Sequence, residues 1–203
     1  MTDPERIPAD LVKRLRDLTG AGMMDCKRAL VETGGDLQQA LDLLRTRGIA
    51  RSEKRRGRQA GEGVVDAYIH GEGRIGVLVE VNCETDFVAR TEDFRWLARE
   101  VAMQIAARDP GWISRDDVPE DVVARERKIY EEQARDTGKP EKVLGRIVDG
   151  KMEAFFKDTV LLDQPYIRED GKTVSDLVSE VAARVGENVV IRRFARFKLG
   201  EEG

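Results

Sequence analysis

Apolar residues recur at spacings of three and four through the first part of the chain. Between residues 8 and 48 this period predicts three short helices. Glycines at positions 20, 22, 34 and 35 separate them, and Asp36 with Gln39 forms a capping-box pattern at the start of the third. These residues predict a small three-helix module of about 40 residues, near the lower size limit for independent folding.

After residue 61 the period changes to that of a strand. Residues 63–70 and 74–81 alternate between apolar and polar positions, and a glycine-containing loop at 71–73 joins them as a hairpin. Residues 188–199, rich in Val, Ile and Phe, predict a third strand. Arg192, Arg193 and Arg196 occupy both of its faces, so one face is solvated or meets a partner. Such a narrow sheet has open edges that a second copy of the chain could cover.

Helical periodicity returns after Ala89. It predicts one helix to about residue 108 and an antiparallel helical hairpin at about 118–157. Residues 158–171 lack periodicity and predict a surface loop. Thr173 with Asp176 marks the start of the last helix, and Gly186 closes it. The fold class is therefore α+β, with a three-helix module at 1–49, a basic linker at 50–61 and an α+β core domain at 62–203.

Residues 82–88 form the junction where a strand gives way to a helix. Asp86 is interpreted as the helix N-cap, where its carboxylate would accept backbone N–H bonds. Phe87, taken in isolation, favours a buried core position, because aromatic side chains partition into protein interiors. A Phe at the tip of such a junction could instead anchor a partner.

Charge and composition narrow the class of protein. The 203 residues carry a formal charge of −4 with 36% charged side chains, which argues against nucleic-acid binding through the whole surface. The basic run within 51–58 is interpreted as a solvated segment, with contact to RNA or an acidic partner as the alternative. The chain has no apolar run long enough to span a membrane and its first residues do not resemble a signal peptide, so we expect a cytoplasmic protein.

Candidate chemistry is sparse. His70 is the only histidine, Cys26 and Cys83 lack metal-ligand spacing, and the carboxylates form no recognisable acid–base pair. We therefore expect no enzyme, cofactor or metal. The adjacent Met23 and Met24 are either core filler or an adaptable contact surface. Pattern and spacing alone thus indicate an interaction protein of unidentified partner.

Two motifs carry a resemblance to a known family. Residues 11–16 (LVKRLR) with 19–27 (TGAGMMDCK), and residues 80–89 (EVNCETDFVA), resemble the N-terminal signature and the hallmark segment of bacterial elongation factor Ts. The segments 138–140, 164–166 and 185–188 also resemble this family, so the resemblance covers almost the whole chain.

The resemblance implies a guanine-nucleotide exchange factor for elongation factor Tu. It implies a ubiquitin-associated-like N-terminal module, followed by an α+β dimerisation domain with a three-stranded antiparallel sheet, flanking helices and the helical hairpin. No direct nucleic-acid contact is expected. The positions that match the family's contacts with the GTPase are Arg16, Met23, Met24, Thr85, Asp86, Phe87, Val88, Val185 and Gly186, and the Asp86–Phe87 pair would act near the partner's magnesium site.

The chain resembles a short form of the family, in which a homodimer supplies both halves of a core that longer members carry twice. Histidines of the longer members have no counterpart, because Glu100 and Gln104 occupy that pattern. The alternative function is a ubiquitin-associated-like adaptor or RNA-associated module that uses Arg51 to Arg58.

Overall fold

The computed structural model describes residues 7–19, 21–53, 55, 57–138 and 140–201, with the side chains of 49–53 outside that description. Contacts divide the chain into two compact units that are each built from separated segments. Unit 1 comprises Met1–Val64, Val81–Leu97 and Val178–Val190, and unit 2 comprises Val65–Glu80, Ala98–Leu177 and Ile191–Gly203.

The predicted N-terminal helices are present in unit 1. They are α1 (Ala9–Thr19), α2 (Met23–Glu32) and α3 (Leu37–Glu53), so the third helix continues beyond Gly48 into the predicted linker. The Asp36 side chain accepts a hydrogen bond from the backbone N–H of Gln39 at 2.9 Å, as the capping pattern predicted. The three helices share one apolar core, formed by Val12, Leu15, Cys26, Ala29, Leu30, Ala40 and Leu44.

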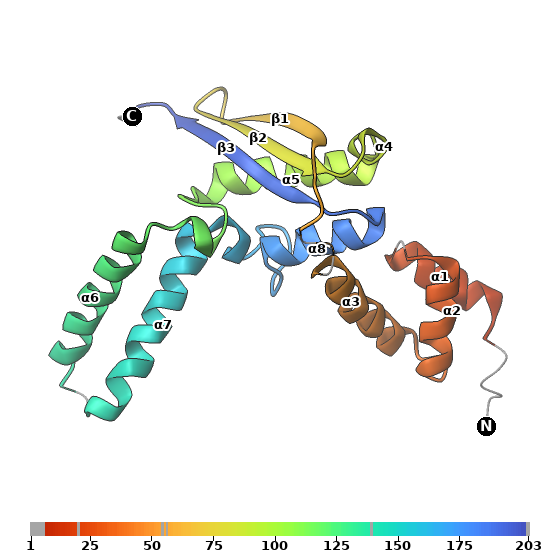
Figure 1. Cartoon of the computed structure of the whole chain (residues 1–203), viewed down its shortest axis with the longest axis horizontal. Helices are drawn as coiled ribbons and strands as arrows, with labels where there is room; N and C mark the ends of the chain where they lie inside the picture. The colour runs from red at the N-terminus through yellow and green to blue at the C-terminus, as the bar shows by residue number, and fades with distance from the viewer. Residues whose placement is uncertain (1–6, 20, 54, 56, 139, 202–203) are drawn as a thin grey trace. The chain divides into compact units, whose positions relative to one another are not determined.

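The sheet has the predicted three strands, β1 (Glu62–His70), β2 (Ile75–Cys83) and β3 (Val190–Lys198), in the order β1-β2-β3. It is antiparallel, and the Leu199 amide donates to the Arg74 carbonyl at 2.9 Å, which places the end of β3 beside the start of β2. Figure 1 shows the two outer strands on either side of β2.

Helix α5 (Glu92–Arg108) lies against one face of this sheet. Arg99 approaches Asp66 of β1 to 3.7 Å, and Arg196 of β3 pairs with Asp109 just beyond α5 at 3.2 Å. On the opposite face Arg193 pairs with Glu80 at 2.7 Å. Alternation then places exposed apolar side chains on the face away from α5, namely Val65, Ile69, Leu78 and Phe197.

The predicted helical hairpin is formed by α6 (Glu120–Asp136) and α7 (Glu141–Thr159), which lie side by side in Figure 1. Ala134, Val148 and Met152 form its buried core. Arg115, in the short 3-10 helix Arg115–Asp117, pairs with Glu153 at 2.8 Å and with Asp163 at 3.0 Å. These ion pairs tie the base of the hairpin to the segment that follows α7.

The surface loop predicted for residues 158–171 holds for residues 167–171, which are exposed, but is wrong for the residues before them. Leu161–Asp163 form a 3-10 helix, and Val160, Leu161, Gln164 and Tyr166 are buried. Gln164 can be buried because its amide group is satisfied: it accepts from Gln104 Nε2 at 3.0 Å and donates to the Asp158 and Arg108 carbonyls at 2.9 and 3.3 Å. The missing periodicity reflected irregular backbone, which interior side chains stabilise.

The last helix, α8 (Val174–Val185), begins with the predicted capping box. Asp176 accepts from the Thr173 amide at 2.9 Å, and Thr173 Oγ1 accepts from the Asp176 amide at 3.1 Å. The helix ends at Gly186, whose φ of 81° and hydrogen bond to the Ala182 carbonyl form the left-handed C-terminal cap.

The buried glutamine gives a stability prediction. Gln164→Ala should lower the free energy of unfolding by about 2–3 kcal/mol, because it leaves Gln104 Nε2 and two carbonyls without this partner in the interior. Urea unfolding followed by circular dichroism measures the change. Gln38→Ala on the exposed surface of α3 is the matched control and should change stability by less than about 0.5 kcal/mol. Equal effects of the two substitutions would contradict the interior role of Gln164.

Candidate functional site

The junction after β2 contains a very short helix, α4 (Asp86–Ala89), of four residues. Thr85, not Asp86, is its N-cap: the Thr85 side chain accepts from the Val88 amide at 3.4 Å. The prediction of Asp86 as the cap is therefore wrong by one position. Asp86 is the first helical residue and pairs with Arg90 at 2.8 Å, one turn further along. Its carboxylate is half exposed and faces the surface.

Phe87 lies on the surface, and the residue is 78% exposed. The interpretation of Phe87 as core, drawn from the residue in isolation, is wrong. Its neighbours hold the backbone instead: Cys83 and Ala89 are buried, and Cys83 Sγ donates to the Thr85 carbonyl at 3.1 Å. An aromatic ring is thus presented to solvent on a segment that is anchored on both sides.

A carboxylate from the far end of the sequence holds this junction. Glu187 Oε2 accepts from the Glu84 and Thr85 amides, both at 3.0 Å, and Oε1 accepts from Thr85 Oγ1 at 2.7 Å. In return, Glu84 Oε1 accepts from the backbone N–H of Asn188 at 2.7 Å. We call these four residues, Glu84, Thr85, Glu187 and Asn188, the carboxylate clasp.

The pattern of the sequence did not assign a role to the clasp. Glu187 and Asn188 were recognised only as a segment of family type, and their partners lie about one hundred positions earlier. The clasp joins the loop before α4 to the end of α8, where Val185 is half-buried and Gly186 is exposed. It thereby links two groups of predicted site residues, 85–88 and 185–186.

The remaining predicted site residues lie on the N-terminal helices. Arg16 on α1 is exposed, and Met23 and Met24 at the start of α2 are 45% and 64% exposed. The core-filler alternative for the two methionines is therefore excluded. Every predicted site residue belongs to unit 1.

The thiol of Cys83, within the junction, is buried. Burial raises the pKa of the Cys83 thiol to about 11, and the nearby Glu187 carboxylate adds to the shift by disfavouring the thiolate. Burial also raises the pKa of Cys26. His70, the exposed last residue of β1, lies 3.0 Å from the Tyr68 hydroxyl. Within the described part of the chain no group of three or more His, Cys, Asp or Glu side chains is placed to hold a metal ion.

Glu100 and Gln104, at the positions that the resemblance matches to histidines of longer members, are interior here. Glu100 is buried, accepts from the Tyr166 hydroxyl at 2.6 Å and pairs with Arg168 at 2.8 Å. Gln104 is buried against Gln164. Both side chains therefore stabilise unit 2.

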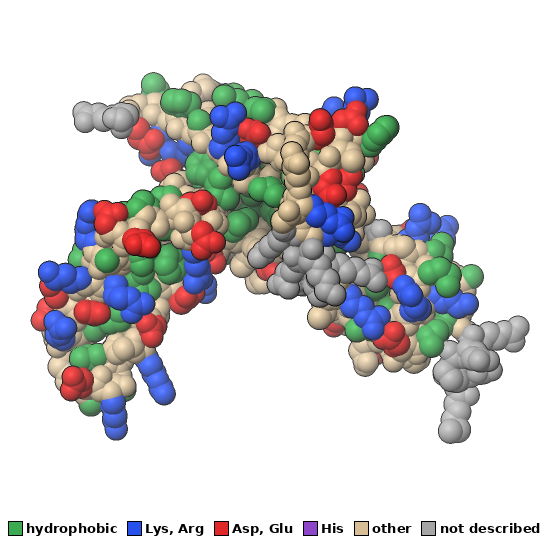
Figure 2. All heavy atoms as spheres, viewed as in Figure 1, with side chains coloured by type: hydrophobic (Ala, Val, Ile, Leu, Met, Phe, Trp, Pro, Cys, Tyr) green, Lys and Arg blue, Asp and Glu red, His purple; other side chains and the backbone are tan. Residues whose placement is uncertain are grey.

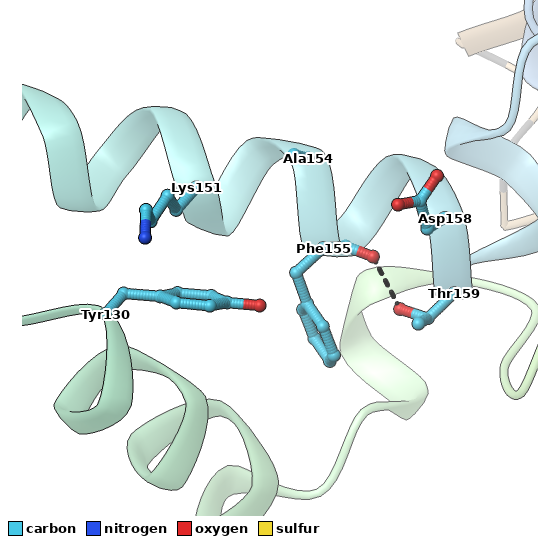
Figure 3. Close-up of a pocket in the computed structure, with 6 residues that line it drawn as sticks. All are labelled: Tyr130, Lys151, Ala154, Phe155, Asp158 and Thr159. Atoms are coloured by element: carbon cyan, nitrogen blue, oxygen red, sulfur yellow. Dashed lines mark hydrogen bonds between the residues drawn. The ribbon is translucent and has the colours of Figure 1, made fainter. Parts of the chain in front are cut away.

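A surface pocket on the helical hairpin contains none of the predicted site residues. Figure 3 shows Tyr130 of α6 facing Lys151 and Phe155 of α7, with Thr159 Oγ1 donating to the Phe155 carbonyl at 2.7 Å. The Lys151 ammonium lies 5.5 Å from the Tyr130 ring centroid. The side chains that line the pocket pack the two helices together.

The basic run is only partly described, since Lys54 and Arg56 lie outside the described residues, as do the side chains of Arg51 and Glu53. Arg55 donates to the Ala182 carbonyl at 3.1 Å, and Arg58 approaches Glu84 of the clasp to 3.5 Å. These two arginines are engaged within unit 1. Figure 2 shows acidic and basic side chains intermingled over the visible face. None of the described helices combines the length and apolarity required to cross a membrane.

Comparison with known proteins identifies the class. The family model "Elongation factor TS" matches residues 48–201. The elongation factor Ts of Syntrophomonas wolfei is 58% identical over 195 residues, which cover 96% of this chain and 91% of that protein. Those of Coprothermobacter proteolyticus and Caldanaerobacter subterraneus are 56% and 58% identical, with 99% and 98% of their lengths covered.

The junction and these matches place the chain among the translation elongation factors. Within that class it belongs to the elongation factor Ts family, as the resemblance of its two motifs predicted.

The pKa of Cys83 predicts its reactivity. In a Cys26→Ala background, the rate of Cys83 alkylation by iodoacetamide should rise with a pH midpoint of about 11 in the folded chain, and of about 9 after unfolding in urea. Because folding raises this pKa, the protonated Cys83 thiol contributes to the free energy of unfolding. This contribution is complete below about pH 9 and is lost as the pH rises to about 11. Mass spectrometry gives the rates. A midpoint in the folded chain at or below about 9 would contradict the shift.

Proposed function

We propose that this protein is a guanine-nucleotide exchange factor that binds the GDP form of elongation factor Tu and promotes GDP release, so that GTP can bind during translation elongation. Family membership supports this function. The observation that carries it is the exposure of Phe87, 78%, within the segment that resembles the family's hallmark. An aromatic side chain exposed on an anchored segment is suited to insertion into a partner.

The mechanism is thermodynamic linkage. A protein that binds the nucleotide-free GTPase more tightly than the GDP form must weaken GDP binding by the same factor. We infer that Phe87 and Asp86 stabilise a GTPase conformation in which the magnesium ion and the phosphate ligands are displaced. Removing an ion that neutralises phosphate charge weakens the hold on GDP. No covalent bond changes on the exchange factor, which therefore needs no catalytic group or cofactor of its own.

The contact surface proposed for the GTPase combines two parts of unit 1. The first consists of Arg16, Met23 and Met24 on the N-terminal helices, where the exposed thioethers provide an adaptable apolar surface. The second consists of Thr85, Asp86, Phe87 and Val88 with Val185 and Gly186. The exposure of Phe87 and the clasp that joins these last two segments support the assignment.

We further propose that two copies of the chain pair through the sheet. Open edges on β1 and β3 motivated this expectation, and the face away from α5 adds support, because Val65, Ile69, Leu78 and Phe197 are exposed on it. A second copy would remove this apolar surface from water, and a two-to-two complex with elongation factor Tu would follow. The ubiquitin-associated-like character of residues 1–49, the linker at 50–61, the core domain at 62–203 and a cytoplasmic location stay predictions.

The role of Phe87 is tested by truncation. Phe87→Ala should lower the rate of GDP release from elongation factor Tu, measured in the presence of this protein, by at least about tenfold. This factor is equivalent to about 1.4 kcal/mol in the activation free energy. The fold should remain intact, because the removed ring is exposed. Release of fluorescent GDP measures the rate, and circular dichroism checks folding.

Ile129→Ala is the control for this substitution. It removes an exposed apolar side chain from α6, in unit 2, and should leave the exchange rate unchanged. If the wild-type protein at saturation does not accelerate GDP release, the proposed function is wrong. If Phe87→Ala exchanges normally, the role of Phe87 is wrong.

Pairing through the sheet predicts the mass in solution. Light scattering at micromolar concentration should give about twice the chain mass of 22.8 kDa. Phe197→Lys, which places a charge on the apolar face, should shift the mass towards that of one chain. Ile129→Lys on α6 should not. A single-chain mass for the wild type would exclude the homodimer.

A further inference from the structure

Helix α4 is too short to be stable by its own hydrogen bonds. It has four residues, and helix formation has a nucleation cost that a single turn does not recover. Two of the backbone bonds around it are long, with the Ala89 amide 3.3 Å from the Thr85 carbonyl and the Arg90 amide 3.3 Å from the Phe87 carbonyl. Its conformation must therefore be imposed by the residues that flank it.

The flank towards α5 is fixed locally. Thr91 Oγ1 donates to the Val88 carbonyl at 2.8 Å and accepts from the Phe94 amide at 3.4 Å, while Ala89 is buried. The flank towards β2 depends on the carboxylate clasp. Glu187 takes three hydrogen bonds there, and the one from Thr85 Oγ1 orients the hydroxyl that caps the Val88 amide.

The Glu187 bonds are of the strong kind. Glu187 accepts from two successive backbone amides and a hydroxyl, and a carboxylate acceptor makes such bonds charge-assisted. The reciprocal bond from the Asn188 amide to Glu84 fixes the two backbones in one register. Asn188 Nδ2 also donates to the Arg58 carbonyl at 2.9 Å, so a third segment is held to the clasp.

We propose that Glu187 is a positioning residue for nucleotide exchange: it acts through Thr85 to hold α4, and thereby fixes the direction in which Phe87 projects. This inference rests on the proposed exchange function and assigns Glu187 no contact with the GTPase. The reason is preorganisation, since a side chain already fixed in its binding orientation loses less conformational entropy on association. Without the clasp, Phe87 remains exposed but samples many directions.

The first test is independent of the GTPase. In Glu187→Ala, the amides of residues 84–89 should exchange with deuterium at least about tenfold faster, because three hydrogen bonds to this segment are lost. Amides of the α6–α7 hairpin should not change. Glu187→Gln should recover most of the protection, since its amide oxygen can accept both backbone N–H bonds and its amide nitrogen can donate to Thr85 Oγ1. Unchanged protection of 84–89 in Glu187→Ala overturns the proposal.

The second test is a double-mutant cycle on the GDP release rate. Glu187→Ala should lower the rate about fivefold or more in the wild-type background, and less than about twofold when Phe87 is already Ala. Glu187→Gln should recover most of the rate. Thr85→Val, which keeps the branched shape but removes the hydroxyl, should lower it in the same direction and serves if Glu187→Ala does not fold.

Glu153→Ala is the matched control in this cycle. It removes a carboxylate that makes two hydrogen bonds of 2.8 Å to Arg115 in unit 2, and should leave the GDP release rate unchanged. If Glu187→Ala lowers the GDP release rate by the same factor with Phe87 and with Ala at position 87, Glu187 does not act through Phe87. That result overturns this inference and leaves the proposed exchange function standing. If the wild-type chain fails to accelerate release, the proposed function is overturned as well, and deuterium exchange separates the two results.

Discussion

The carboxylate of Glu187 is the interaction on which the candidate site depends. It accepts hydrogen bonds from the backbone N–H groups of Glu84 and Thr85, in a loop outside regular secondary structure, although it lies about one hundred positions later in the sequence. A single turn of helix can then persist and carry an exposed aromatic side chain. Phe87 itself is exposed to water, and the backbone that carries it is held by contacts between segments that are distant in sequence.

Unit 2 uses the same principle in its interior. Glu100, Gln104, Gln164 and Tyr166 are buried polar residues, and hydrogen bonds among their side chains and to nearby carbonyls satisfy them. This network lets a segment without regular periodicity pass through the interior between α7 and α8. Polar side chains in both units therefore stabilise irregular backbone that apolar packing alone would leave with unpaired amides.

The proposed exchange function requires contact surfaces rather than reactive groups, and the exposed side chains of this chain fit that requirement. Its unusual features are exposed apolar side chains, on α2, on α4 and on the open face of the sheet, rather than clusters of reactive groups. The buried thiols are protonated at neutral pH, as burial raises the pKa of both Cys83 and Cys26. Binding energy that differs between two states of a partner is sufficient to change its nucleotide affinity.

The sequence by itself determined the α+β class, the three N-terminal helices, the three strands, the helical hairpin and the family, because periodicity and short motifs are local properties. It did not determine that Thr85 rather than Asp86 caps α4, that Phe87 is exposed, or that Val160, Leu161, Gln164 and Tyr166 are buried. Either Thr85 or Asp86 satisfies the local pattern of a cap, and Glu187, the residue that holds Thr85, lies far away in sequence. Gln104, the partner that allows Gln164 to be buried, is also distant from it in the chain. Only the tertiary structure brings those partners together, so only it decides which side chains are supports and which remain free to meet another protein.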